Sequence, residues 1–308
     1  MRWLVTGAAG MLAREVINRL EAERDPATWL LALDRAALDI TDQTAVDAAV
    51  KRHRPDVVVN CAAYTAVDSA EVHEDEALRV NGEGPAYLAE ACAARRSRLI
   101  HISTDYVFRG DTHVPYLEHD SPAPGTAYGR TKLAGECAVV GHMRDSAVIV
   151  RTAWLYASHS RNFVQAMAAR AQRGEEVAVV EDQVGSPTWA ADVAERIVVL
   201  GRLPDAGGIF HAANSGEATW HELAREVFSL SGADPDLVHP IRTRSLTSPT
   251  PRPAYTVLGN SHWPRVGLEP LRDWRSALLQ ALIQRSASGG RISERRSPRV
   301  PAPSRRKP

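Results

Sequence analysis

The chain has 308 residues, 44% of them hydrophobic, and its 37 basic and 37 acidic residues give a formal net charge of zero. This balance provides no overall attraction to nucleic acid or to an anionic membrane surface. No apolar run approaches the ~18 residues that cross a bilayer, no signal-peptide pattern precedes the first strand, and the three cysteines lack the number and spacing of a disulfide framework or a metal site. We therefore expect a cytoplasmic enzyme.

A glycine-rich turn separates the first predicted strand, residues 2–6, from the first predicted helix, residues 12–20. Glycines at positions 7 and 10 permit a tight turn and a close backbone approach, and the free N–H groups of the helix start attract a pyrophosphate. Ala13 stands where a third glycine often occurs and is small enough for close packing of helix on sheet. The pattern predicts a dinucleotide site. Its candidate residues are Gly7, Gly10, Met11 and Leu12.

The second predicted strand, residues 29–33, runs into Asp34 and Arg35. An acid about twenty residues past the glycine-rich turn is placed to bind the ribose hydroxyls of NAD, whereas a guanidinium can hold the 2′-phosphate of NADP. The alternative explanation is that both residues are ordinary polar residues at the end of a strand. For Arg35 this alternative has about the same weight as a specific contact, whereas for Asp34 it has less. The pattern leaves the choice between NADH and NADPH open.

Strands and helices then alternate along the chain. Helical patterns cover residues 41–53, 75–95 and the segment around 128, and apolar strands cover residues 56–60, 99–103 and 147–151. This alternation predicts a doubly wound parallel α/β sheet that binds its ligands beyond the carboxyl ends of the strands. We expect residues 1–150 to form this Rossmann domain and residues 151–285 to form a smaller substrate-binding lobe.

Three segments of the second half have their own predictions. The apolar segments 177–180 and 209–212 are candidates to return to the main domain as strands. Residues 219–231 are predicted to form a helix of the lobe, because Thr219 and Glu222 have the spacing of a capping box.

Tyr128 and Lys132 lie four residues apart in a predicted helix, which puts the phenol and the ammonium on one face. A phenol titrates near ~10, so its use as an acid or base near neutral pH requires a stabilised anion. A fixed lysine charge is one way to stabilise it. Chance spacing explains such a pair when it stands alone, but the glycine-rich turn upstream favours a functional pair.

The chain resembles the dTDP-4-dehydrorhamnose reductases, a group of extended short-chain dehydrogenase/reductases. The matching segments are residues 6–13, 38–42, 60–68, 103–108, 128–132, 151–156 and 252–253. The first and fifth are shared across the superfamily, whereas the second, third, fourth and last are narrower. The resemblance extends from residue 1 to residue 285.

This resemblance implies that NADPH, or alternatively NADH, reduces the 4-keto group of dTDP-4-dehydrorhamnose to give dTDP-L-rhamnose. Tyr128 would protonate the carbonyl oxygen, Lys132 would lower the pKa of Tyr128 and bind the nicotinamide ribose, and Thr104 would polarise the carbonyl. The further residues implied to bind the cofactor are Asp34, Arg35, Asp39, Ile40, Ala62, Ala63 and Tyr64. Those implied to bind the substrate are Val67, Asp105, Tyr106, Trp154 and Arg252.

Other activities compete with this interpretation. Nucleotide-sugar dehydratases that resemble this chain carry an Asp-Glu pair after the threonine, whereas here Asp105 is followed by Tyr106, which favours simple reduction. The Tyr128–Lys132 pair taken by itself is also compatible with an epimerase. A reductase of a related sugar, as in dihydrostreptose formation, and a non-catalytic NADP-binding regulatory subunit are further alternatives. The intact Thr104, Tyr128 and Lys132 favour an enzyme over the regulatory subunit.

Some relatives bridge a dimer through a metal held by acids near residue 15 and near residue 190. Glu15 matches the first position, but Asp192 is the one acid around the second, and hard cations need several oxygen ligands. We expect no metal site, a solvated Glu15, and a monomer or weak homodimer.

The neutral net charge conceals a basic C-terminus. Residues 285–308 contain eight basic residues and one acid, which makes this segment +7 and the remaining 284 residues −7. Its Ser, Pro, Gly and Arg content predicts a disordered tail over residues 286–308. A solvated extension is favoured over a contact with nucleic acid or an acidic partner.

Overall fold

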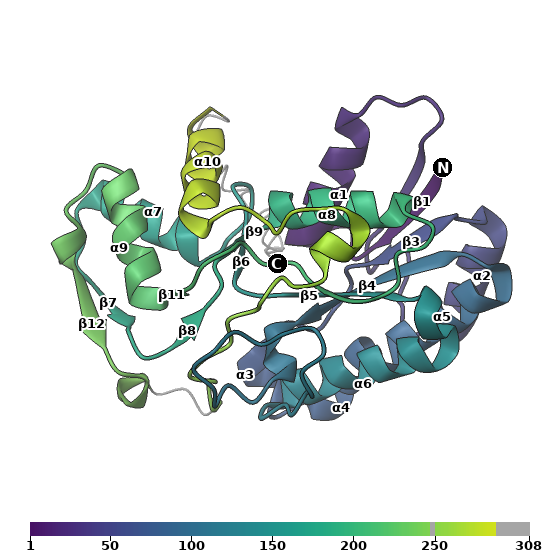
Figure 1. Ribbon diagram of the computed structural model, residues 1–308, viewed down its shortest axis with the longest axis horizontal. Helices are drawn as coiled ribbons and strands as arrows, with labels where there is room; N and C mark the ends of the chain where they lie inside the picture. Colours follow the sequence, from purple (N-terminus) through teal and green to yellow (C-terminus); the bar gives the residue numbers. More distant parts are fainter. Residues whose placement is uncertain (247–249, 288–308) are drawn as a thin grey trace, which may run out of the picture.

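The computed structural model describes residues 1–246 and 250–287. A six-stranded parallel sheet lies at its centre, in the order β10-β5-β4-β3-β1-β2 (Figure 1). Its strands are β1 (Arg2–Thr6), β2 (Trp29–Leu33), β3 (Val57–Asn60), β4 (Arg98–Thr104), β5 (Val148–Thr152) and β10 (Gly208–His211). The strand order reverses between β1 and β3, and such a reversal is where doubly wound sheets bind their ligands.

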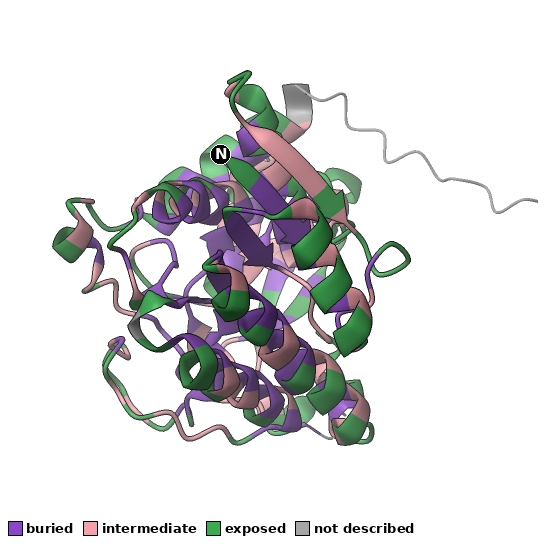
Figure 2. Ribbon diagram, turned by 90° about the vertical axis from the view of Figure 1, so that its right-hand side faces the viewer, coloured by how far each residue is buried: buried purple, intermediate pink, exposed green. Residues whose placement is uncertain are grey.

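Helices cover both faces of this sheet, as Figure 1 shows. One face carries α1 (Met11–Ala22) and α8 (Ala190–Arg202), and the other carries α2 (Gln43–His53), α5 (Gly84–Arg95) and α6 (Ala127–Met143). Successive side chains of a strand point to opposite faces, so Val57 and Val59 pack with the first group of helices and Val58 with the second. Buried residues follow the sheet and the inward faces of the helices in Figure 2. The predicted doubly wound α/β fold is confirmed.

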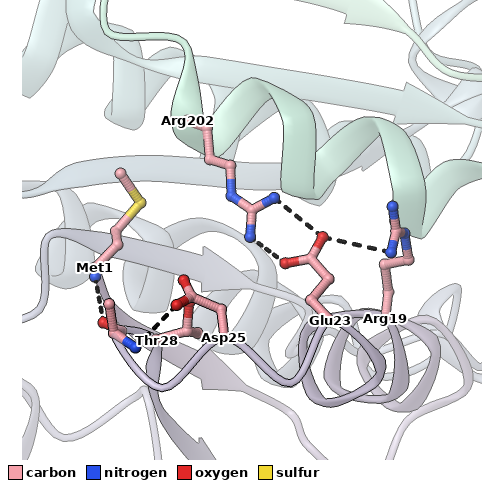
Figure 3. Close-up of polar contacts among 7 residues, drawn as sticks. Met1, Arg19, Glu23, Asp25, Thr28 and Arg202 are labelled. Atoms are coloured by element: carbon pink, nitrogen blue, oxygen red, sulfur yellow. Dashed lines mark hydrogen bonds and ion pairs between the residues drawn. The ribbon is translucent and has the colours of Figure 1, made fainter.

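The contact between α1 and α8 ends in an ion cluster, drawn in Figure 3. The carboxylate of Glu23, just after α1, accepts a hydrogen bond from Arg202 at the end of α8 (3.0 Å) and lies 3.4 Å from Arg19. These pairs tie an element from the second half of the chain to the first helix of the sheet domain.

A π-helical turn (Arg79–Glu83) joins α4 (Glu74–Leu78) to α5, within the helix predicted over residues 75–95. Asn81 in this turn is buried, accepts a hydrogen bond from the backbone N–H of Tyr64 (2.8 Å) and donates one to Thr131 of α6 (3.1 Å). The loop after β3, which continues into α3 (Val67–Ala70), is thereby held against α6.

The smaller lobe has its own apolar core, made by three helices and a two-stranded sheet. The helices are α7 (Phe163–Arg173), α9 (Trp220–Leu230) and α10 (Trp274–Ala287), and the strands are β7 (Val177–Val180) and β12 (Val238–Ile241). Two short pairs lead into it, β6 (Leu155–Tyr156) with β9 (Thr188–Trp189) and β8 (Val184–Gly185) with β11 (Ala218–Thr219). The predicted capping box of α9 is present.

Two sequence-based expectations need correction. Residues 208–211 do return to the main sheet as β10, but β7 pairs with β12 instead, because β10 takes the place beside β5 and the inward side chains of β7 pack between α7 and α9. Glu15 is not solvated: it is 5% exposed, and its Oε1 lies 3.0 Å from Nδ1 of His159 in the loop after β6.

Three further expectations concern the tail, a metal and a membrane. The tail lies outside the described residues, except for residues 286 and 287 at the end of α10. Within residues 1–246 and 250–287, no group of three His, Cys, Asp or Glu side chains is arranged to hold a metal ion. None of the helices in the described part of the chain has the length and apolar character needed to span a membrane.

Candidate active site

A cavity of about 690 Å³ opens at the carboxyl ends of the central strands. Its wall includes every predicted site residue except Asp34 and Arg252. Asp34 is exposed and accepts a hydrogen bond from the backbone N–H of Ala37 (3.0 Å), so it stabilises the turn after β2. Its neighbour Arg35 does line the cavity, with its guanidinium 4.0 Å from the carboxylate of Asp39.

One end of the cavity is formed by the glycine-rich turn. Gly7 has a φ of +64°, and a Cβ there would lie 2.7 Å from the backbone nitrogen of Ala62 at the end of β3. Gly10 is the N-cap of α1 and has no side-chain hydrogen bond, which leaves the first amides of the helix for an anion. A backbone cradle that any Cβ would fill, next to a free helix N-terminus, fits the pyrophosphate of a dinucleotide.

The three predicted catalytic residues meet at the wall of the same cavity. Thr104 ends β4, whereas Tyr128 and Lys132 lie on α6, whose N-cap Thr126 accepts a hydrogen bond from Gly129 (3.0 Å). Gly129 brings the helix close, since a Cβ there would lie 2.1 Å from the carbonyl oxygen of Tyr106. The hydroxyl of Tyr128 is hydrogen-bonded to Thr104. The helix cap and the close approach of α6 thus place the phenol at the end of β4.

Burial dominates the electrostatics of Tyr128 and Lys132. Burial raises the pKa of Tyr128 above its ordinary value, and the hydrogen bond to Thr104 opposes it. This direction is opposite to the one expected from a neighbouring lysine. Lys132 is 2% exposed and donates a hydrogen bond to the carbonyl oxygen of Ile102 (2.6 Å); burial lowers its pKa to about 8. The phenol therefore stays protonated at neutral pH, the form that a proton donor needs.

Asp105 lies directly behind Thr104 and is 2% exposed. Its Oδ1 accepts a hydrogen bond from the hydroxyl of Thr104 (2.9 Å), and burial raises its pKa to about 6. A threonine hydroxyl has a single hydrogen. Thr104 must therefore turn away from Asp105 before it can donate to a substrate carbonyl.

The opposite end of the cavity carries an aromatic pair that the sequence did not predict. The ring of Trp154 stacks on Trp220 of α9, with centroids 3.7 Å apart and an interplanar angle of 9°. Trp154 has a φ of +43°, which is strained for an aromatic residue. Gly185 makes room for it, because a Cβ there would lie 2.4 Å from its indole ring. Trp220 carries no local signal, since its partner lies on a distant segment.

Arg252 lies behind the cavity wall. Its guanidinium donates hydrogen bonds to the hydroxyl of Tyr106 (3.1 Å) and to the carboxylate of Asp68 (2.6 Å). The ring of Tyr106 in turn contacts Tyr128 edge-on, with centroids 5.6 Å apart. Arg252 thus holds an aromatic neighbour of Tyr128. Cys61 is another of the wall residues that were not predicted; burial raises the pKa of its thiol to about 12.

Comparison with known proteins decides the family. The family described as "RmlD substrate binding domain" matches residues 1–287. A protein of Streptomyces griseus named dTDP-4-dehydrorhamnose reductase is 50% identical over 294 residues, which cover 94% of this chain and 96% of the relative. The chain belongs to the dTDP-4-dehydrorhamnose reductase family. The predicted family is confirmed.

Two more members of this family bear on the site. A protein of Streptomyces antibioticus is 53% identical over 283 residues, 91% of this chain and 94% of its own, and is named a probable dTDP-4,6-dihydroxy-2-methyloxan-3-one 4-ketoreductase. The crystal structure of dTDP-4-dehydrorhamnose reductase from Bacillus anthracis in complex with NADP is 35% identical, covers 92% of this chain and 99% of its own, and has a TM-score of 0.87. The cavity described above thus belongs to a fold that holds NADP in a relative.

Proposed function

We propose that this protein is an NADPH-dependent reductase of dTDP-linked 4-keto-6-deoxysugars, with dTDP-4-dehydrorhamnose as its first candidate substrate and dTDP-L-rhamnose as the product. The observation that carries the proposal is the convergence of Thr104, Tyr128 and Lys132 on one cavity whose far end is the glycine-rich cradle. The names of the relatives supply the class of substrate.

The residues of the cavity divide the reaction among them. When bound, NADPH supplies the hydride that adds to the carbonyl carbon. Tyr128 donates its proton to the carbonyl oxygen, and its raised pKa keeps that proton available. Lys132 stabilises the resulting phenolate by charge and binds the nicotinamide ribose. Thr104 aligns the phenol and, after turning from Asp105, donates to the carbonyl oxygen.

The remaining assignments follow the cavity wall. Arg35 holds the 2′-phosphate of NADPH at the rim, a role that fits its place on the wall better than Asp34 fits a ribose contact. Trp154 and Trp220 bound the sugar end, and Arg252 positions Tyr106 there. The remaining wall residues of the cofactor half are Gly7, Gly10, Met11, Leu12, Asp39, Ile40, Ala62, Ala63 and Tyr64, and those of the sugar half are Val67 and Asp105.

The proposal also includes the domain division, the cellular location and the oligomeric state of the protein. Residues 1–150 carry the cofactor and residues 151–285 cap the sugar, with α8 and β10 returning to the sheet domain. We place the enzyme in the cytoplasm as a monomer or weak homodimer.

A different 4-keto sugar is the second candidate substrate. The relative from Streptomyces antibioticus is named for another dTDP-linked ketosugar, and its identity of 53% is similar to the 50% of the relative from Streptomyces griseus. The two candidates differ in the sugar alone, so the cofactor and the acid keep their roles.

The test follows absorbance at 340 nm with NADPH and dTDP-4-dehydrorhamnose generated in situ, with product identification by mass spectrometry and chromatography. Oxidation that depends on the sugar and forms dTDP-L-rhamnose supports the proposal. If NADPH is oxidised only in the presence of a related dTDP-4-keto sugar, that sugar, the second candidate, is the substrate. NADPH binding without oxidation across the panel contradicts the enzyme and favours a binding subunit.

A further inference from the structure

A buried row of polar groups runs from β1 to Lys132. The backbone N–H of Ala62 (3.2 Å) and the hydroxyl of Thr6 (2.7 Å) both approach Oδ1 of Asn60. The side-chain nitrogen of Asn60 lies 3.1 Å from Nδ1 of His101, and Nε2 of His101 lies 3.4 Å from Nζ of Lys132. Thr6, Asn60 and His101 are all 0% exposed, so water does not compete for these contacts.

The donors at one end of this row determine the proton position at the other. A backbone N–H can only donate, so the Asn60 atom facing Ala62 is the oxygen and the atom facing His101 is the amide nitrogen. That amide donates to Nδ1 of His101. Burial, followed by the charge of Lys132, lowers the pKa of His101 well below its ordinary value, so the ring is neutral. A neutral ring that accepts at Nδ1 carries its hydrogen on Nε2.

That hydrogen is directed at Lys132. An ammonium has three donors and no acceptor, so the charged lysine meets the N–H of His101 donor to donor, whereas an uncharged amine accepts this hydrogen bond. One hydrogen of Lys132 already goes to the carbonyl oxygen of Ile102 (2.6 Å). The row therefore favours the uncharged form of Lys132.

Two other titratable groups act on Lys132. Glu136 on the same helix favours its charged form, but both carboxylate oxygens of Glu136 accept hydrogen bonds from the buried guanidinium of Arg151 (2.9 and 2.7 Å). Cys61 acts in the same direction as Glu136, but its own raised pKa keeps it a neutral thiol. Both groups oppose burial, which is the largest influence on the pKa of Lys132 and lowers it.

We propose that His101 is a positioning residue, neutral with its hydrogen on Nε2, which destabilises the ammonium of Lys132. It thereby sets the pH above which Lys132 loses the charge that stabilises the phenolate left when Tyr128 gives its proton to the reduced sugar oxygen. This inference rests on the proposed function.

The proton position is measured without turnover. Long-range ¹H–¹⁵N NMR of the full-length protein labelled with ¹⁵N-histidine distinguishes the two neutral ring forms and the charged ring. The signal that disappears in His101→Phe belongs to His101. We expect a hydrogen on Nε2 and no titration between about pH 5 and 9, since full burial moves a pKa by several units. A hydrogen on Nδ1, or a charged ring at neutral pH, overturns the inference even if the enzyme reduces its sugar.

Two variants test the consequence for Lys132. Activity that needs a protonated lysine falls as the pH rises through its pKa, which is about 8. His101→Phe removes the N–H that faces Lys132, so the pKa of Lys132 rises. The alkaline limb of the pH profile of kcat then moves up by about one pH unit. Asn60→Asp presents an acceptor to Nδ1, moves the ring hydrogen there and turns Nε2 toward Lys132 as an acceptor, which shifts the limb in the same direction. His119→Gln, at an exposed histidine, leaves the limb in place.

The outcomes separate the inference from the proposed function. An unmoved limb in both His101→Phe and Asn60→Asp, with folded proteins and measurable turnover, contradicts the role of His101 and leaves the reductase intact. If no sugar supports turnover, the proposed function fails, and the ring form of His101 is still decided by NMR. If His101→Phe does not fold, Asn60→Asp decides the shift.

Discussion

At the glycine-rich end of the cavity, where we propose that the cofactor binds, the contacts are made by backbone atoms, as where Gly7 meets Ala62. At the proposed sugar end they are made by side chains, as where Trp154 meets Trp220. The first contact joins two adjacent strands of one parallel sheet, and the second joins a strand exit to a helix of the lobe. Where the backbone itself makes the contact, a side chain larger than glycine would fill the space. Where side chains make the contact, a substitution can reshape the wall for a different ligand. Under the proposed function, the backbone half of this cavity would hold the cofactor and the side-chain half would select the sugar.

The largest effect is expected where the two ends meet, at Tyr128. Tyr128→Phe removes the proton donor and leaves the ring in place, so kcat falls by about 10²- to 10⁴-fold. The dissociation constant of NADPH, measured by fluorescence titration, stays within twofold. Tyr87→Phe, on α5, is the matched control and keeps full activity. Turnover that survives in Tyr128→Phe would remove the proposed acid.

A smaller effect is expected from Gly7→Ala, which tests the backbone end alone. The new Cβ would lie 2.7 Å from the nitrogen of Ala62 at a φ of +64°. Strain of this kind costs about 1–3 kcal/mol, so we expect NADPH to bind about 5- to 150-fold more weakly in a titration calorimeter. Gly141→Ala is the control, because nothing lies within 4 Å of its added methyl group and the helix gains propensity. Unchanged NADPH binding in Gly7→Ala would place the pyrophosphate elsewhere.

Trp220→Ala tests the side-chain end in the same way. An aromatic pair contributes about 0.5–1.5 kcal/mol, so the KM for the sugar nucleotide rises by up to about tenfold. The KM for NADPH stays constant, which is the reverse of the pattern for Gly7→Ala. Trp220→Phe keeps an aromatic ring at this position and shows a smaller rise. Equal changes in both KM values would show that the two ends are not separable.

The smallest effect concerns the ion cluster that joins the halves through α1 and α8. The hydrogen bond from Arg202 is the main cause that lowers the pKa of Glu23. A carboxyl group with a lowered folded-state pKa stabilises the fold above its unfolded pKa, and this contribution disappears as the pH falls through the folded pKa. Because surface pairs contribute little, Glu23→Gln costs less than about 1 kcal/mol in urea unfolding at pH 7 and nothing at pH 2. A larger loss at pH 2 than at pH 7 would contradict this account.

Sequence patterns predicted most of the residues on the cavity wall but not the contact between Trp154 and Trp220, for a physical reason. The spacing of Gly7 and Gly10 and the exits of β3 and β4 are local, and the topology of a parallel sheet brings them together. Trp154 was recognised as a strand exit, but its stacking on Trp220 depends on how the lobe closes. No local pattern encodes that closure.

Burial was a second source of error. The Tyr–Lys spacing predicted a lowered pKa for Tyr128, but the depth of the phenol reverses the direction. Glu15 was expected to be solvated because no metal site was predicted there, yet the loop carrying His159 lies against it. In both cases the missing information was which distant segment lies over the residue.

The measurement that tests the central claim most directly follows the hydride itself. The protein is supplied with NADPH in which both hydrogens at C4 of the nicotinamide are deuterium and with dTDP-4-dehydrorhamnose, and the product is analysed by mass spectrometry and NMR. The account predicts one deuterium at C4 of dTDP-L-rhamnose with the wild type, and the same product formed about 10²- to 10⁴-fold more slowly with Tyr128→Phe. A product without deuterium, or deuterated product formed at the same rate by Tyr128→Phe, would contradict it.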